Sequence, residues 1–248
     1  MRFLFPTYAI LIFMKVINLD KEIFEKACSL CEKDFSHEEI LQTLANGNDF
    51  EKQIAILKIK QLKSNEEAEL LISHLTGHDG PIREVCAIKL NELITKKECP
   101  LIDNKQFYPT FADAICDVNP NISRTIIDFL PILNMQHYML ELLINKIETI
   151  FQRIENPDLE QKNFLTVRLF NLYWCLEAIG TLIHNLENFD SKIKLLNFLE
   201  KAVKFNNYTI DEKVARILVS STYKNSNNNI IEELKSSQNF YVRRYFAG

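Results

Sequence analysis

The chain has 248 residues, and its 29 lysines and arginines against 33 aspartates and glutamates give a formal net charge of −4. Apolar residues make up 47% of the sequence and charged residues 25%, which excludes a disordered or collagen-like chain. Only five glycines and seven prolines are present, too few for the many tight turns that an all-β chain requires.

The first thirteen residues, MRFLFPTYAILIF, are strongly apolar. This run is shorter than the roughly 20 residues that cross a bilayer, and no small-residue cleavage site follows it. For residues 1–13 we favour a mis-annotated start or a disordered leader over a secretory signal or a membrane anchor. We predict that residues 14–248 form a single cytoplasmic domain that does not enter a membrane.

After Leu19 nearly every segment carries apolar residues at helical spacing, and no segment alternates strictly between apolar and polar residues. Three segments have Ser or Thr followed three residues later by Glu, at Ser36, Ser64 and Thr209, the spacing of a helix capping box. We predict helices over residues 20–34, 37–46, 50–63, 65–76, 81–96, 105–117, 121–133, 136–154, 159–186, 190–205, 210–222, 228–236 and 239–247.

A pattern at the start of several helices repeats along the chain. An apolar residue at every fourth position begins at Ile82, again forty residues later at Ile122, and again at Ile210, and Val242 opens a further copy. This spacing places one apolar stripe against the preceding helix pair. A helix, a turn and a second helix together take about 30 to 45 residues, the range of helical repeat arrays.

At these residues the chain resembles the HEAT-repeat family of α-solenoids, in which a turn bearing Asp or Pro leads into a Val-Arg-x-x-Ala-x-x-x-Leu helix. Residues 71–90 carry the clearest match, residues 237–244 the second, and residues 177–182 look like the end of the first helix of such a repeat. The resemblance implies an all-α, right-handed superhelix of about five to six helix pairs. It also implies an inter-repeat ladder, with a solvated surface pair as the alternative, formed by Asp79, Arg83, Asp117 and Arg124.

Sequence motifs for catalysis and metal binding are absent. The chain has no Gly-x-Ser-x-Gly, no Gly-x-x-x-x-Gly-Lys and no Gly-x-Gly-x-x-Gly. His74 and His78 have the spacing of a helical metal pair, but Gly77 and Gly80 indicate that the helix ends there. We therefore assign no catalytic residue, no metal ligand and no cofactor, and consider an enzymatic function less probable than a binding function.

Cysteines are scattered through the helical patterns at six positions: Cys28, Cys31, Cys86, Cys99, Cys116 and Cys175. Their distribution in a long chain indicates reduced core thiols rather than a disulfide framework. Cys28 and Cys31 form a Cys-x-x-Cys pair, but a zinc site needs two further ligands and nearby acidic residues disfavour a thiolate. We interpret the pair as packing residues, with metal or redox use as the alternative.

Charge is distributed unevenly. Residues 191–248 hold ten lysines and arginines but five aspartates and glutamates, so this segment could attract nucleic acid or an acidic protein, or simply be a solvated face. The stretch around Arg243 and Arg244 resembles one in HEAT-like DNA alkylation-repair glycosylases, a family that also uses paired tryptophans, whereas this chain has one, Trp174. Tyr173 and Trp174 lie in the densest aromatic segment and either anchor a partner or pack between repeats.

The leading prediction is a non-enzymatic scaffold whose concave surface binds a protein or peptide. The alternatives are a HEAT-like nucleic-acid-binding protein of the glycosylase type and a chromophore-lyase-like subunit. The sequence leaves the partner and the oligomeric state open. The predicted binding residues are Tyr173, Trp174, Arg216, Arg243 and Arg244.

Overall fold

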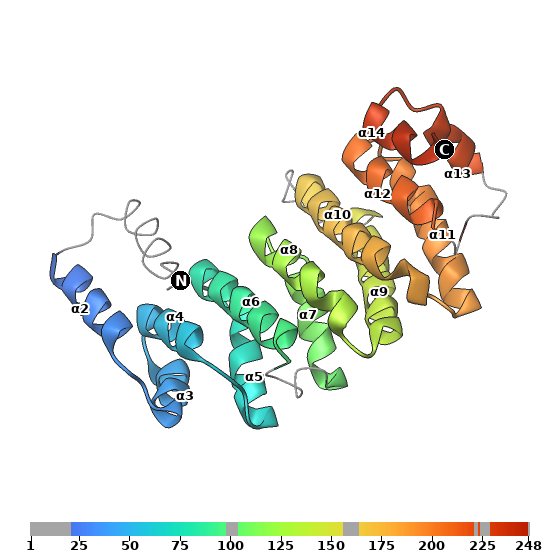
Figure 1. The fold of residues 1–248 in the computed structure, drawn as a ribbon. Coiled ribbons are helices and arrows are strands. Elements are labelled where there is room, and N and C mark those ends of the chain that lie inside the picture. The colour runs from blue at the N-terminus through green and yellow to red at the C-terminus, as the bar shows by residue number, and fades with distance from the viewer. Residues whose placement is uncertain (1–20, 98–103, 156–163, 221–222, 224–228, 248) are drawn as a thin grey trace. The chain divides into compact units, whose positions relative to one another are not determined.

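The computed structural model describes residues 21–97, 104–155, 164–220, 223 and 229–247 (Figure 1). Within these ranges the regular structure consists of thirteen α-helices and five short 3-10 helices, without a strand. The predicted all-α class is therefore confirmed. Contacts divide the chain into two compact units, the first ending at Ile59 and the second beginning at Lys60. In the described part of the chain, no helix combines the length and apolar character needed to cross a membrane.

Unit 1 contains α2 (Lys21–Glu32), α3 (His37–Asn46) and α4 (Asp49–Lys58), and α4 contacts both other helices. The predicted capping box at the start of α3 is confirmed. The Ser36 hydroxyl accepts the Glu39 N–H at 3.2 Å, and the Glu39 carboxylate accepts the Ser36 N–H at 2.8 Å. This reciprocal pair satisfies two backbone groups that a helix start leaves without partners.

The helix predicted over residues 50–63 is too long. It ends at Lys58, and Ile59 has an extended backbone with φ −61° and ψ 124°. Ile59 and Leu62 are nevertheless buried. Two buried apolar residues three positions apart can come from an extended segment as well as from a helix, so periodicity alone placed the boundary wrongly here.

Unit 2 contains ten α-helices, connected in part by 3-10 turns. The α-helices are α5 (Asn65–Ser73), α6 (Gly80–Thr95), α7 (Tyr108–Ala114), α8 (Pro120–Phe129), α9 (Gln136–Glu155), α10 (Phe164–Leu182), α11 (Phe189–Val203), α12 (Tyr208–Leu218), α13 (Asn229–Lys235) and α14 (Phe240–Arg243). The 3-10 helices are η1 (His74–Thr76), η3 (Lys105–Phe107), η4 (Leu130–Ile132), η5 (Ile183–Asn185) and η6 (Arg244–Phe246).

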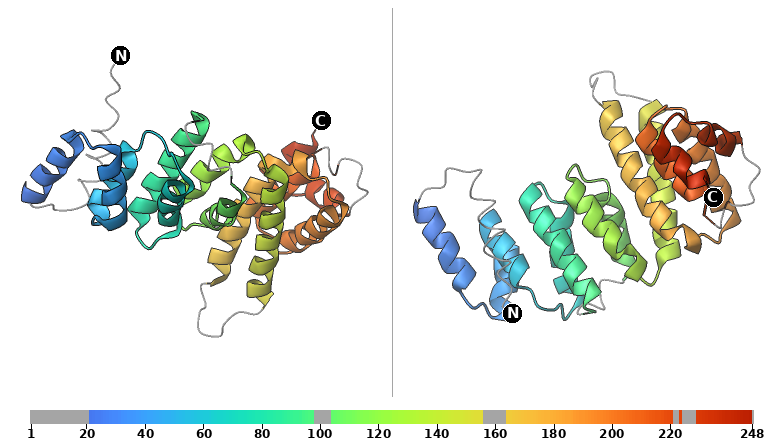
Figure 2. Two further views of the ribbon diagram at one scale, coloured as in Figure 1. Left: turned by 90° about the horizontal axis from the view of Figure 1, so that it is seen from below. Right: turned by 45° about the horizontal axis from the view of Figure 1, so that its top comes forward.

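Two series of contacts order the helices of unit 2. In the even-numbered series, α6, α8, α10, α12 and α14 each contact the next member. In the odd-numbered series, η1 contacts α7, α7 contacts α9 and α9 contacts α11. From α7 onward each odd-numbered helix also contacts the even-numbered helix that follows it, and α9 and α10 lie side by side as a long pair (Figure 2).

The core of unit 2 is built from the apolar stripes of these helices. Phe111 of α7 and Phe129 of α8 are fully buried and meet edge to face, with ring centroids 5.3 Å apart. Tyr108 is also fully buried, and its hydroxyl accepts the Met135 N–H at 3.3 Å. A buried Tyr needs such a partner, because an unpaired hydroxyl in an apolar core costs free energy.

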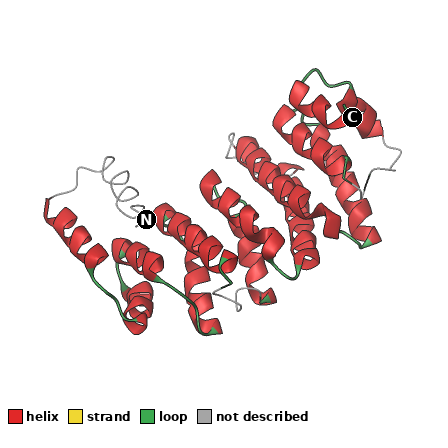
Figure 3. Cartoon of the chain, viewed as in Figure 1, coloured by secondary structure: helices red, strands yellow, loops and turns green. Residues whose placement is uncertain are grey.

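Four helices of unit 2 begin in the same way, each after a short loop (Figure 3). At α6, α8, α12 and α14 the residue before the helix is Asp or Asn, and its side chain accepts a backbone N–H. Three residues after each cap a buried apolar residue follows, which confirms the register of the repeated pattern. The caps are Asp79, Asn119, Asn207 and Asn239, and the buried residues are Ile82, Ile122, Ile210 and Val242.

The next residue along the chain ties the preceding turn to the helix. Arg83, Ser123 and Arg243 each donate a side-chain hydrogen bond to the carbonyl six residues earlier, at 2.8, 3.4 and 2.7 Å. Asp211 occupies the equivalent position after Asn207. Because Asn207 caps α12, the predicted cap at Thr209 is wrong: the Thr209 hydroxyl lies inside the first turn and donates to the Asn207 Oδ1 at 2.7 Å.

Candidate functional site

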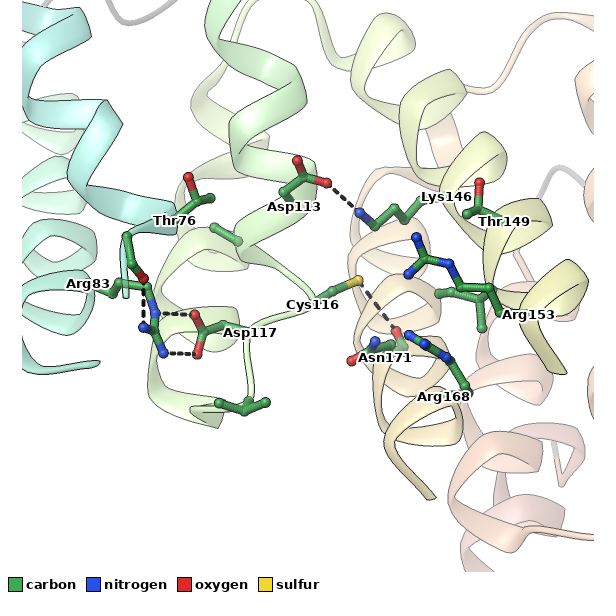
Figure 4. A pocket seen from close by; sticks show the side chains of 14 residues that line it. Thr76, Arg83, Asp113, Cys116, Asp117, Lys146, Thr149, Arg153, Arg168 and Asn171 are labelled. Carbon is green, nitrogen blue, oxygen red and sulfur yellow. Dashed lines mark hydrogen bonds and ion pairs between the residues drawn. The ribbon is translucent and has the colours of Figure 1, made fainter. Parts of the chain in front are cut away.

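An open hollow of about 390 Å³ lies in unit 2, lined by residues of η1, α6, α7, α9 and α10 and by the turn after α7. Six of the fourteen lining residues carry charged side chains. They enter it from two sides: Arg83 and Asp117 on one, and the basic residues of α9 and α10 on the other (Figure 4). The charged lining residues are Arg83, Asp113, Asp117, Lys146, Arg153 and Arg168.

Arg83 and Asp117 form a two-point ion pair. The Arg83 Nε lies 2.6 Å from the Asp117 Oδ2, and Nη2 lies 3.3 Å from Oδ1. The remaining terminal nitrogen of Arg83 donates to the carbonyls of Gly77 and His78 at 2.8 and 3.0 Å. The two side chains are only 13% and 9% exposed, so the pair is held rigidly and has little charge left to offer a ligand.

Two of the four predicted ladder residues therefore meet, and two do not join them. Asp79 caps its own helix by accepting the Ile82 N–H at 2.7 Å. Arg124 is exposed on α8 and forms no ion pair with a residue that the structure describes. The contact between Arg83 and Asp117 links the start of α6 to the turn after α7.

The opposite side of the hollow carries an excess of positive charge. Lys146 of α9 forms an ion pair with Asp113 of α7. Arg153, seven residues further along α9, is exposed and has no ion pair with a described residue. Burial and the neighbouring charge of Arg153 lower the pKa of Arg168 on α10. With four basic and two acidic lining residues, the hollow has a surplus of two positive charges.

A cysteine pair lies on the floor of this basic side. Cys116, in the turn after α7, lines the hollow and is half-buried, while Cys175 of α10 is buried. Their sulfur atoms are 3.4 Å apart. The hydrogen bond from Cys175 lowers the pKa of the Cys116 thiol, burial opposes that effect, and Lys146 lowers the pKa further. The same hydrogen bond and burial raise the pKa of Cys175 well above its ordinary value.

The predicted aromatic residues lie on α10 outside the lining of the hollow, and Tyr173 contacts α12. Trp174 is only 6% exposed and meets Tyr173 edge to face, with centroids 5.0 Å apart. Tyr173 is half-buried beneath Lys213, whose Nζ is 4.9 Å from the ring centroid. Of the two rings, that of Tyr173 has more surface to offer a partner.

Arg216 belongs to the same contact. Its Nη1 lies 2.6 Å from one carboxylate oxygen of Glu177, and the Lys213 Nζ lies 2.9 Å from the other. Burial raises the pKa of Glu177, but Lys213 and Arg216 more than offset that effect, so its pKa is lowered. This half-buried ion triad links α12 to α10.

The basic residues near the C-terminus are largely engaged. Arg243 donates to the Ser237 carbonyl. Arg244 pairs with Glu212 at 2.8 Å and lies over the rings of Tyr241 and Tyr245. Further ion pairs join Lys194 to Glu148 and Lys201 to Glu155. Carboxylates therefore offset much of the positive excess that the sequence shows over residues 191–248.

Sequence reasoning missed the basic residues of the hollow. Lys146 and Arg153 are seven residues apart, which places them on one face of a helix, and this spacing was the available signal. Their approach to Arg168 and Cys116 depends on how α7, α9 and α10 pack, which local patterns do not encode.

No group of three or more His, Cys, Asp and Glu residues in the described ranges has the arrangement of a metal site. Cys28 and Cys31 lie on α2, where burial raises the pKa of Cys31 although Lys58 opposes it. His74 begins the 3-10 turn after α5, and His78 follows it in the loop before α6. The α-helix therefore ends at Ser73, before both histidines, and the helix predicted over residues 65–76 finishes as a 3-10 turn.

Comparison of the chain with protein-family models, with curated proteins and with solved structures gave no match. The functional assignment therefore rests on the geometry of the hollow. Guanidinium and ammonium groups around an open space are suited to binding carboxylate or phosphate oxygens, because arginine can present two parallel N–H donors to such groups.

Proposed function

We propose that the chain is a non-enzymatic α-solenoid of the HEAT-repeat type, and that the hollow in unit 2 binds an acidic segment of a partner protein. The surplus of positive charge in the hollow carries this proposal. The two contact series of helices and the four matching helix starts support a repeat architecture, with α5 to α14 as five helix pairs of a right-handed superhelix.

The charges of the hollow differ in their availability. Arg83 is nearly buried against Asp117, and Lys146 is paired with Asp113. Arg153 lies exposed at the opening, close enough to Arg168 for its charge to lower the pKa of Arg168. The two positive charges repel one another, and an incoming carboxylate relieves that repulsion while accepting hydrogen bonds from Arg153.

The protein segment is favoured over a small molecule because the hollow is open rather than enclosed and is lined by residues of several successive helices, from η1 and α6 through α7 to α9 and α10. Solenoid proteins use surfaces of this kind, spread over neighbouring repeats, to hold extended segments. Shape and charge complementarity, without covalent chemistry, then provide the affinity.

Fluorescence anisotropy with a labelled octaglutamate peptide tests the proposal, with octaglutamine as the uncharged control. We expect the acidic peptide to bind and its affinity to fall as salt rises from 50 to 300 mM, because screening weakens exposed charge interactions. Arg153→Glu should weaken binding about tenfold or more, equivalent to about 1.4 kcal/mol.

Arg124→Glu is the matched control, since it makes the same charge change at an exposed arginine that does not line the hollow. Equal losses in the two variants would show that the peptide responds to net charge and would contradict the proposed site. A single-stranded DNA oligonucleotide, added as competitor, addresses nucleic acid as the alternative: displacement that depends on Arg243 and Arg244 rather than on Arg153 would favour that function.

A further inference from the structure

The pair of cysteines in the hollow has the geometry of a reactive thiol and its resolving partner. The Cys116 and Cys175 sulfurs are 3.4 Å apart, whereas a disulfide bond is about 2.05 Å long. Closing the remaining distance of about 1.4 Å requires little movement, and Cys116 lies in a turn rather than in a helix. Cys175 is fixed in the middle of α10.

The two sulfurs differ in accessibility. Cys116 lines the open hollow, and Cys175 is buried behind it. A reagent that enters from solvent therefore reaches Cys116 first. Either sulfur of the pair could donate their hydrogen bond, and once Cys116 is a thiolate the Cys175 thiol can donate it.

The charges around Cys116 favour an anion. Lys146 of α9 lowers the pKa of Cys116, Asp113 of α7 raises it to a smaller extent, and Arg153 and Arg168 line the same hollow. Positive charge stabilises the thiolate, which is the reacting form of a cysteine. It also raises the local concentration of negatively charged reagents.

We propose that Cys116 is a modification site for anionic low-molecular-weight disulfides that enter the hollow, and that Cys175 resolves the product into an intramolecular Cys116–Cys175 disulfide. This goes beyond the proposed binding of an acidic segment and does not depend on it. The sequence predicts that both cysteines are reduced core thiols, and the juxtaposition of the two sulfurs distinguishes them from the other thiols that the structure describes.

The reaction proceeds by two thiol–disulfide exchanges. The Cys116 thiolate attacks one sulfur of the small disulfide, a new S–S bond forms, and the disulfide's own S–S bond breaks to release one thiolate. Cys175 then loses its proton and attacks the Cys116 sulfur, which releases the second thiolate. Overall, two protein thiols are oxidised to a disulfide, one small disulfide is reduced to two thiols, and the two protons pass to those products.

The test uses the full chain with Cys28, Cys31 and Cys99 replaced by Ser, which removes the two half-buried thiols of α2 and a cysteine outside the described residues. Cys86 remains because it is fully buried and burial raises the pKa of its thiol. The probe is 5,5′-dithiobis(2-nitrobenzoate), an anionic disulfide whose released thiolate absorbs visible light.

We expect two equivalents of thiolate per chain and a protein mass that is two hydrogens lower with no label attached. Cys175→Ser should release one equivalent and keep the label on Cys116, and Cys116→Ser should remove the fast reaction. Arg153→Gln should slow the anionic probe about threefold or more but not the cationic disulfide cystamine, because charge attraction is lost only for the anion. Arg124→Gln should leave both rates unchanged.

Peptide mapping of the protein without the Cys116 or Cys175 substitution provides a readout that does not depend on the folding of those variants. A Cys116–Cys175 cross-link after treatment supports the proposal. Any of three results would overturn the proposal. Both cysteines could stay labelled, Cys175 could react first, or the anionic probe could react equally fast with Arg153→Gln and Arg124→Gln. Failure of octaglutamate to bind would refute only the proposed function, since the thiolate release is measured without a peptide.

Discussion

Arg83 and Asp117 lie side by side through two nitrogen–oxygen contacts, at 2.6 and 3.3 Å, although 34 residues separate them in the chain. Arg83 also donates hydrogen bonds to two carbonyl groups of the turn before α6. One side chain thus holds together the turn before α6, the start of α6 and the turn after α7. This junction forms one wall of the hollow (Figure 4).

Arg83→Ala should lower the free energy of unfolding by about 3 kcal/mol. The change leaves the Asp117 carboxylate largely buried without its cation, and it removes the donors for the Gly77 and His78 carbonyls. Urea denaturation followed by circular dichroism measures the loss. Arg124→Ala, at an exposed arginine, should stay within about 0.5 kcal/mol of the unsubstituted chain, and a similar cost at both positions would contradict the assigned role of Arg83.

The raised pKa of Asp211 should make the free energy of unfolding depend on pH. Burial and the nearby Glu233 raise the pKa of Asp211 from 3.8 to about 6, and its buried Oδ1 has no hydrogen-bond partner among the residues that the structure describes. Because the folded state binds this proton more tightly than the unfolded state, stability falls as the pH rises from about 4 to 6 and the carboxyl ionises.

Asp211→Asn should therefore raise stability at pH 7 by about 1 kcal/mol, a value reduced from the full linkage energy because water still screens half of this group. The gain should disappear below about pH 4, where both side chains are neutral. Denaturation curves at pH 4, 5, 6 and 7 measure the difference between the two proteins, and a difference that stays constant over this range would refute the raised pKa.

Gly180→Ala should stabilise unit 2 by about 0.5 to 1 kcal/mol. A methyl group at Gly180, inside α10, would meet the Arg216 side chain at 3.6 Å, an ordinary contact distance. Alanine also loses less backbone entropy on folding into a helix. Thermal unfolding checks the direction, and the comparison is Gly47→Ala, where the new carbon would lie 2.5 Å from the Thr43 carbonyl oxygen and should destabilise.

Glu177→Gln should cost about 2 kcal/mol at pH 7, because it leaves Lys213 and Arg216 without their shared carboxylate. The lowered pKa of Glu177 contributes stability above its ordinary value of 4.5, and this contribution is lost as the pH falls through the folded pKa. The two proteins should thus converge in acid. Glu200→Gln, an exposed change on α11, should show neither effect in the same denaturation series.

The fold prediction depended on interactions between residues that are close in the sequence. The helix predicted over residues 37–46 is found at His37–Asn46, and the helix predicted over 136–154 at Gln136–Glu155, because caps and apolar spacing act within a few residues. Two predictions were wrong because a second local signal was present. Asn207 rather than Thr209 caps α12, and the buried residues Ile59 and Leu62 have helical spacing although they follow the end of α4.

The hollow required tertiary information. Lys146 and Asp113 are 33 residues apart, and Cys116 and Cys175 are 59 residues apart. Which residues meet across such separations depends on the contacts of α7 with α9 and of α9 with α10. Arg83 and Asp117 could be predicted to interact because each lies beside a turn. No local sequence feature distinguishes Arg153 from other surface arginines.

The hydrogen bond between a side chain and the preceding turn has a consequence for how far the sequences of similar helix starts can differ. At the fourth position after the cap, the Arg83 guanidinium and the Ser123 hydroxyl each donate a hydrogen bond to the carbonyl six residues earlier. Replacing one such donor by another preserves the hydrogen bond to the turn but reduces the sequence identity between the two helix starts. Helix starts of this kind can thus differ in residue identity and keep the same geometry, so the capping and turn hydrogen bonds identify them better than identical residues do.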